Sequence, residues 1–307
     1  MVSAVVPMLA ITLLAAASSA GAAAPADAPT PVTGDGVTGT LLRYASFPSR
    51  QVAPRNVDVW LPPGYADHPE RRYPVIYMHD GQNLFDPASS FGGVDWGVDE
   101  TMARMIEAGQ LRPAIVVGVW NTPKRREEYM PQRAVQSSVK MNVPGAADLA
   151  PGDIVSDRYV DFLATELKPF VDAHFRTLPG RADTIVMGSS MGALVSQYAM
   201  SRYPDVYGAA GCVSTHWPAG DGIALDDFAA HLPDPATHRY WFDYGTGTLD
   251  ATYEPYQRRA DQILRAGGYV EGVNWVTRKY AGAEHSEKSW RLRVAEPLVF
   301  LLGPPLP

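Results

Sequence analysis

The sequence has a single cysteine, Cys212, among its 307 residues, so the chain can form no internal disulfide and its stability must come from packing. Cys212 lies in the apolar run AAGCVST, which favours a buried, small hydrophobic residue over a reactive thiol. An excess of positive charge is also missing, since 26 Lys and Arg stand against 33 Asp and Glu. The resulting net charge of −7 argues against a nucleic-acid surface and against a general attraction to anionic lipid, and it favours a neutral or weakly polar partner.

Charged side chains are absent from the first 24 residues, and the apolar run there is too short and too rich in alanine to favour a permanent membrane span. This stretch is typical of an export signal, because the small residues Ala20, Ala22 and Ala24 suit an A-x-A cleavage site. No basic residue follows the initial methionine, which departs from the usual pattern, and a disordered alanine-rich tail is the alternative. We therefore predict a signal peptide over residues 1–24 and a mature protein that is periplasmic or secreted.

Internal repeats and a second composition regime are absent too, so we predict one domain over residues 37–307, after a flexible leader over 25–36 that is rich in Ala, Pro, Asp and Gly. The first two strand-like runs, GTLLRYASF and NVDVWLPPGY, are close enough to pair antiparallel. Later runs such as PVIYMH, AIVVGVW, TIVMG, GAAGCVST, YWFDYG and VNWVTRKY alternate with longer amphipathic stretches. This alternation predicts a doubly wound α/β fold with a mostly parallel sheet, interrupted by a long loop over residues 130–154.

A short glycine-flanked serine motif stands where the run TIVMG meets the amphipathic stretch MGALVSQYAMSRY. The join reads GSSMG, residues 188–192, and places Ser190 at the centre of G-x-S-x-G. A serine hydroxyl is a weak nucleophile, so an enzyme must expose it beside a base and near donors for an oxyanion. A sharp strand-to-helix turn provides both, and flanking glycines allow the close backbone approach that it needs. A glycine-rich turn with an incidental serine is the alternative.

A base and an acid should follow the serine, in the order Ser, Asp or Glu, His. His285, in YAGAEHSEKSW, comes directly after the last predicted strand, and His216, in VSTHWP, is its rival. We prefer His285 because it alone lies downstream of a plausible acid. That acid is Asp250, on the loop of YWFDYGTGTLDATY, while Asp243 within the strand would be a buried structural carboxylate. An unperturbed histidine has a pKa of about 6.5, so activity should rise through neutral pH.

An oxyanion hole needs backbone N–H groups, one of them from the residue after the nucleophile, here Met191. The loop after PVIYMH offers the second, because Gly81 lets it turn close to the serine and the Gln82 amide follows. Asp80 beside His79 also suggests a metal site. No helical H-x-x-x-H or paired histidine spacing supports that interpretation, so we predict no metal.

With these motifs the chain resembles an esterase family of the α/β-hydrolase superfamily. That family contains enterochelin esterases, S-formylglutathione hydrolase, feruloyl and acetylxylan esterases and the mycolyltransferase antigens. The resemblance runs from about Leu41 to Leu302 and rests on YMHDGQNLFD, GVWNTPKRREEYMP, GSSMG, DYGTGTLD and GAEHSEKSW. It implies an α/β-hydrolase fold and an enzyme without a cofactor. In such relatives the serine, a carboxylate after the GT turn and the late histidine are catalytic, which matches Ser190, Asp250 and His285.

Residues on the same rim are candidate substrate contacts. Arg125, in NTPKRREEYMP, would bind a substrate carboxylate or catecholate, or else pair with Glu128 to brace the long loop. Trp217, just after a predicted strand, and Trp96, at the start of a predicted helix, would line an acyl or aromatic pocket or simply pack in the core.

The leading hypothesis is an exported serine hydrolase of carboxylic esters that works through an acyl-enzyme. Its substrate would be a small-molecule or polysaccharide-linked ester, such as a catecholate trilactone, a hydroxycinnamoyl or acetyl ester or a short acyl thioester. An acyltransferase with the same three residues is one alternative. A non-catalytic binding protein that keeps the fold is the other.

Overall fold

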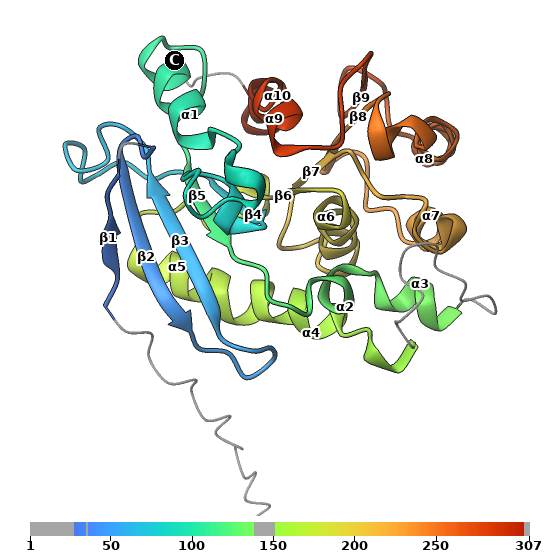
Figure 1. Ribbon diagram of the computed structural model, residues 1–307, viewed down its shortest axis with the longest axis horizontal. Helices are drawn as coiled ribbons and strands as arrows, with labels where there is room; N and C mark the ends of the chain where they lie inside the picture. The colour runs from blue at the N-terminus through green and yellow to red at the C-terminus, as the bar shows by residue number, and fades with distance from the viewer. Residues whose placement is uncertain (1–27, 35, 138–150, 304–307) are drawn as a thin grey trace, which may run out of the picture.

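A nine-stranded sheet runs through the protein (Figure 1). The computed structural model describes residues 28–34, 36–137 and 151–303. Within them the strands lie in the order β1-β2-β3-β5-β4-β6-β7-β8-β9. Their bounds are β1 Thr30–Val32, β2 Thr40–Phe47, β3 Arg55–Leu61, β4 Val75–His79, β5 Ile115–Val119, β6 Thr184–Ser189, β7 Ala209–Val213, β8 Arg239–Gly245 and β9 Trp275–Tyr280. β1, β2 and β3 pair antiparallel with their neighbours, and the pairs from β5 to β9 are parallel, which confirms the predicted fold class.

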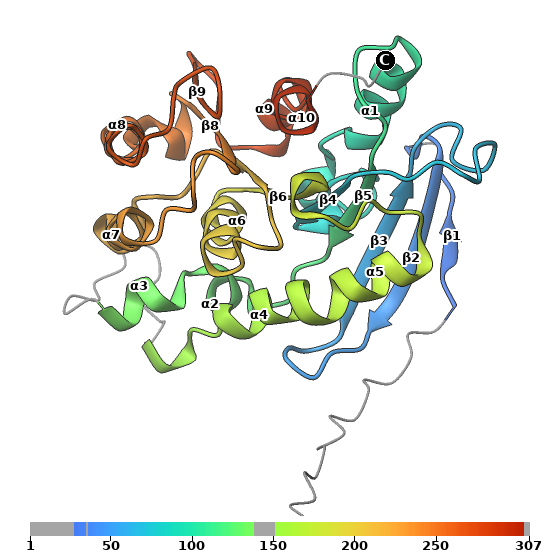
Figure 2. The ribbon, with the colours of Figure 1, turned by 180° about the vertical axis from the view of Figure 1, so that it is seen from behind.

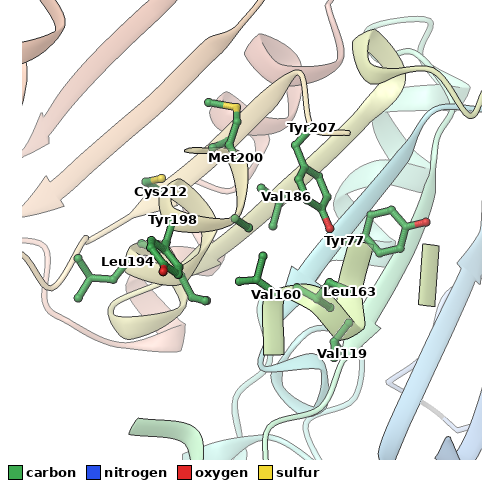
Figure 3. Packing of buried hydrophobic residues seen from close by; sticks show 14 of the residues in the cluster. Tyr77, Val119, Val160, Leu163, Val186, Leu194, Tyr198, Met200, Tyr207 and Cys212 are labelled. Atoms are coloured by element: carbon green, nitrogen blue, oxygen red, sulfur yellow. The ribbon is translucent and has the colours of Figure 1, made fainter. Parts of the chain in front are cut away.

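The central strands are buried on both faces because they are continuous apolar runs. Every residue of β4 and of β6 is buried. Successive side chains enter different cores: Tyr77 belongs to one cluster, whereas its neighbours Ile76 and Met78 belong to the other. Figure 3 shows the first cluster, in which Tyr77 and Val186 of the sheet lie beside helical residues such as Leu163.

Helices cover the two faces unequally. Their bounds are α1 Val98–Glu107, α2 Arg125–Tyr129, α3 Gln132–Ser137, α4 Ser156–Phe162, α5 Lys168–His174, α6 Met191–Arg202, α7 Ile223–Ala230, α8 Glu254–Ala266, α9 Glu287–Arg291 and α10 Ala295–Leu302. One face carries α4 to α8 and the other carries α1, α9 and α10, as both views show (Figure 2). A π-helical turn, Leu163–Leu167, joins α4 to α5. None of the helices in the described residues is long and apolar enough to cross a bilayer.

The carboxyl edge of the parallel strands carries a row of strained turns. The residue that follows β4, β6 or β7 has a positive φ although it is not glycine: Asp80 (57°), Ser190 (58°) and Ser214 (43°). Thr248, in the loop after β8, does likewise (50°). Backbone strain of this kind costs of order 1–3 kcal/mol per residue and concentrates at functional sites. The strain therefore points to this edge as the place to look for chemistry.

The described residues depart from the sequence-based expectation in three segments. Residues 30–32 lie in the expected flexible leader, but they form β1 and pair with Leu41, Leu42 and Arg43 of β2. Three residues are too few to show a strand pattern, and pairing with a neighbour decides their conformation. The expected long loop over 130–154 contains α3, and α7 was not expected at all. The predicted signal peptide, residues 1–24, lies outside the described residues.

Candidate active site

Ser190 stands on a sharp turn between β6 and α6. Its φ of 58° and ψ of −122° fall in a region that residues with a side chain seldom adopt. Neighbouring backbone fixes this conformation, because the Ser190 N–H donates to the carbonyl of Val213 (2.9 Å) and its own carbonyl accepts from the N–H of His216 (3.2 Å). The side chain is half-buried rather than enclosed. This is the geometry that the G-x-S-x-G motif predicts.

Both glycines of the motif lie at close contacts, Gly188 against backbone and Gly192 against side chains. A Cβ on Gly188 would lie 2.9 Å from the backbone carbon of Gly192, the first turn of α6. A Cβ on Gly192 would lie 3.3 Å from Cβ of His79 and from Oδ2 of Asp80. The helix thus starts directly against the strand that precedes it and against the loop after β4. A side chain at Gly188 would therefore force a backbone shift in the turn that holds Ser190.

His285 and Asp250 form a short hydrogen bond near this turn. His285 Nδ1 lies 2.6 Å from Asp250 Oδ1, and the Asp250 side chain is inaccessible to solvent. Burial on its own raises the pKa of Asp250, but the hydrogen bonds from His285 and Ser214 outweigh it and hold that pKa below its ordinary value. An ionised Asp250 fixes the proton of His285 on Nδ1, which leaves Nε2 as the ring nitrogen able to accept a proton.

Asp243, the other acid considered, lies elsewhere. It is inside β8, fully buried, and its carboxylate accepts from Arg293 (2.8 Å) and from the indole of Trp241 (2.8 Å). Burial raises its pKa, although Arg293 opposes the shift. The structure therefore brings Asp250, and not Asp243, to the histidine.

His216, the rival base, belongs to a different pair. Its Nδ1 lies 2.6 Å from the hydroxyl of Tyr253, and burial, with the nearby charge of His285, lowers its pKa to about 4. The Tyr253 ring centroid is 5.7 Å from that of His285, and the effect of burial on the pKa of Tyr253 is opposed by hydrogen bonding to Ser190. Tyr253 thus lies among Ser190, His216 and His285. No hydrogen bond joins His285 to the Ser190 hydroxyl in the described part of the chain; such bonds often form only when substrate is bound.

The two predicted oxyanion donors lie after adjacent strands. Met191 is the first residue of α6, and Gln82 lies in a 3₁₀ turn, Gly81–Asn83, directly after β4. Neither backbone N–H has a partner among the described residues, as expected at helix starts. Gly81 is required here, since a Cβ would lie 2.4 Å from the backbone carbon of Gly118 in β5. The Gln82 side chain turns away and accepts from the N–H of Asn121 (3.2 Å).

Arg125 does not pair with Glu128, so that part of the prediction is wrong. Its guanidinium makes two 2.7 Å hydrogen bonds to the Asp80 carboxylate, which also accepts from Asn121 (2.6 Å). Glu128 is buried and pairs instead with Arg55. Arg125 therefore braces the loop after β4, and it occupies the Asp80 oxygens that a metal would need.

The two tryptophans predicted as substrate contacts are core residues. Trp217 has no exposed surface; its ring packs between Phe228 and Phe242, and its N–H donates to Gln257. Trp96 is 3% exposed and packs against Trp290, with ring centroids 5.3 Å apart. Both predictions of an open pocket wall are wrong, because an apolar ring next to a strand end is equally suited to the core.

Three carboxylates near the start of α1 lie close enough together to bind a single metal ion: those of Asp95, Asp99 and Glu100. Arg291 of α9 already pairs with two of them, Asp95 and Glu100. This group therefore has its countercharge from the protein.

Sequence reasoning missed the residues behind Asp250. Ser214 and Trp290 lie in the quoted runs GAAGCVST and GAEHSEKSW, and Arg293 follows three residues after Trp290. Nothing in their spacing relates them to an acid on another loop. Ser214 donates to Asp250 Oδ2 at 2.6 Å, and it accepts from both of the others. Only the folded sheet brings these side chains together.

Comparison with known proteins agrees with this architecture. The family model described as "Putative esterase" matches residues 51–296. An uncharacterised Bacillus subtilis protein, YbbA, is 21% identical over 84% of this chain and 96% of its own. An enterobactin esterase from Shigella flexneri has a TM-score of 0.62 at 17% identity, over 88% of this chain and 60% of that one. A ferulic acid esterase from Anaeromyces mucronatus has a TM-score of 0.55 at 19% identity, over 87% and 88% of the two chains. With four-fifths of its length matched by the family model, this chain belongs to the putative esterase family.

Proposed function

We propose that the protein is a serine-dependent hydrolase of carboxylic esters that works through an acyl-enzyme. The observation that carries the proposal is the Asp250–His285 hydrogen bond at the same sheet edge as Ser190, a half-buried residue on a strained turn. Membership of an esterase family supports ester hydrolysis independently of that geometry.

The proposed reaction has two halves. His285 Nε2 takes the proton of the Ser190 hydroxyl as its oxygen bonds to the ester carbonyl carbon, and the Met191 and Gln82 amides stabilise the oxyanion. The bond to the alcohol then breaks, and the imidazolium returns its proton to the leaving oxygen. Water repeats the sequence on the acyl-enzyme, releases the acid and restores Ser190. Asp250 stabilises the imidazolium and stays ionised throughout.

The ester substrate is proposed to carry an aromatic ring on its acyl side, because the names of two structural neighbours specify enterobactin and ferulic acid esters. Purified protein would be assayed with methyl ferulate, a catecholate trilactone, acetylated xylan and p-nitrophenyl acetate. Faster turnover of methyl ferulate or of the trilactone than of acetylated xylan is the expected result, and p-nitrophenyl acetate, whose leaving group is activated, serves as the positive control.

Ser190→Ala tests the mechanism itself. The variant should lose p-nitrophenyl acetate turnover and labelling by a fluorophosphonate probe, while its urea unfolding curve stays that of a folded protein. Wild-type protein should gain the mass of one probe, located on the peptide that contains Ser190. Turnover that persists in the folded variant would rule out the assignment.

A further inference from the structure

The side chain of Ser214, directly after β7, is the centre of a buried hydrogen-bond group. It has no exposed surface. Its hydroxyl oxygen lies 2.6 Å from Asp250 Oδ2, 3.0 Å from the indole nitrogen of Trp290 and 2.8 Å from Arg293 Nη2. The backbone is strained to make this possible, with φ at 43°, and is held by the Asp243 carbonyl, which accepts the Ser214 N–H (2.9 Å).

The direction of the Ser214 O–H follows from the chemistry of its neighbours. Indole and guanidinium groups are donors only, so Trp290 and Arg293 fill both acceptor positions of the hydroxyl oxygen. The single hydroxyl proton has one remaining partner, the Asp250 carboxylate. Ser214 is therefore a donor of fixed orientation rather than a rotating hydroxyl.

Arg293 adds a buried positive charge on the far side of Ser214. Its side chain is 4% exposed, and Nη2 also donates to Asp243 Oδ1 (2.8 Å). Trp290 in turn packs its ring against His285, with centroids 5.0 Å apart at 81°. Both donors that orient Ser214 are thus held in place themselves: Arg293 by its hydrogen bond to buried Asp243, and Trp290 by its ring contact with His285.

We propose that Ser214 is a positioning residue: it holds Asp250 as an anion with Oδ1 directed at His285, and Trp290 and Arg293 fix its O–H in that direction. This inference rests on the proposed function, in which Asp250 and His285 serve Ser190. It also gives Asp243 a role, as the partner that keeps Arg293 in place.

Ser214→Ala and Ser214→Gly test the proposal. Both remove the hydroxyl, and glycine also tolerates the positive φ, which separates the hydroxyl from the backbone strain. Loss of a charge-assisted hydrogen bond should lower kcat/KM for p-nitrophenyl acetate by about ten- to a hundredfold in both variants. Without this donor the Asp250 anion attracts the His285 proton more strongly, so the acid limb of the kcat/KM profile should move to higher pH.

Other groups that face His285 stay in place in these variants. They are His216 after β7, Tyr253 in the loop after β8 and Glu287 on α9. The charge of Arg125 on α2 acts in turn on His216 and Glu287. Trp290→Phe keeps a ring against His285 and removes one donor to Ser214; it should shift the profile in the same direction by less. This variant keeps the test open if Ser214→Ala does not fold.

Ser156→Ala is the matched control, because Ser156 is also fully buried and its hydroxyl accepts a hydrogen bond from the N–H of Gln132 (2.8 Å). It should leave kcat/KM and the pH profile unchanged. The proposal is overturned if the Ser214 variants keep the wild-type pH profile, whether or not their rates fall. If Ser190→Ala is inactive in the same experiment, only the role of Ser214 is lost and the proposed function stands.

Discussion

At the scale of single residues, the two histidines that follow strands near Ser190 differ in their partners. His285 donates to an ionised carboxylate, whereas His216 faces the Tyr253 hydroxyl and has a pKa of about 4, so it is neutral at pH 7. An imidazolium forms during the proposed reaction, and of these two histidines His285 is the one hydrogen-bonded to a carboxylate within the described residues.

His285→Ala should therefore lower kcat for p-nitrophenyl acetate by about a thousandfold or more. His216→Ala removes no group from the proposed proton path and should cost less than about tenfold. Steady-state kinetics of the two purified variants, with urea unfolding to verify the fold, makes the comparison. An equal loss in both would contradict the assignment of His285 as the base.

Residue types and order were sufficient to predict that Ser190, Asp250 and His285 lie at one edge of the sheet, with Asp250 and His285 in contact, because the motif is local and the chain order is simple. Their catalytic roles stay predictions. They were insufficient for Trp96, Trp217 and the partner of Arg125, since burial and long-range ion pairing depend on which surfaces meet. Asp80 and Arg125 are 45 positions apart. No spacing rule relates them.

At the scale of elements, close backbone contacts position the loops around Ser190. Gly81, before the Gln82 amide, makes one of these contacts, with β5 backbone 2.4 Å from the place of a Cβ. Neighbouring backbone cannot move aside without shifting a central strand.

Gly81→Ala should destabilise the protein by more than about 2 kcal/mol, and it should reduce activity by moving the Gln82 amide. Gly180→Ala is the control, because Gly180 has a φ of −70° and nothing lies within 4 Å of its Cβ position. Urea unfolding of both variants gives the free energies. A Gly81→Ala protein as stable as the control would show that the loop adapts to a side chain.

Most strands and long helices were predictable, because apolar runs and amphipathic stretches report burial directly. β1, α3 and α7 were not. β1 is three residues long and α3 six, so neither completes two periods of its pattern. α7, with the sequence IALDDFAA, has apolar residues on most of its surface, so its sequence shows no clear alternation of apolar and polar residues at the helical period.

At the scale of the whole molecule, the acidic group beside α1 makes stability depend on pH. Burial, together with a hydrogen bond to Glu100, raises the pKa of Asp99 to about 8. In the unfolded chain Asp99 loses this proton at about pH 4. Between about pH 4 and pH 8, therefore, Asp99 is protonated in the folded state and ionised in the unfolded state. Stability from this group is therefore complete at low pH and is lost as pH rises toward 8, by up to about 1.4 kcal/mol per pH unit.

Asp99→Asn should remove this dependence. The amide oxygen can accept from the Thr38 N–H as the carboxylate does (2.6 Å), and the amide nitrogen can donate to Glu100. The free energy of unfolding of the variant, minus that of wild type, should grow as pH rises from 5 to 8, about the range between the two pKa values. Urea titrations at several pH values measure it. A constant difference would show that Asp99 is ionised throughout.

Export remains a prediction, because the first 24 residues lie outside those described. Amino-terminal sequencing of protein recovered from the periplasm or the medium would be expected to begin after Ala22 or Ala24. Recovery of the full-length chain from the cytosol alone would contradict it.

Cys212 lies within β7, two residues before Ser214, and no part of it is exposed. Burial raises the pKa of its thiol well above the ordinary value, so a thiol-reactive dye cannot modify it while β7 stays paired. Modification requires the strand to open, and no second thiol competes for the dye. The rate of dye incorporation in native buffer therefore measures how often the centre of the sheet opens.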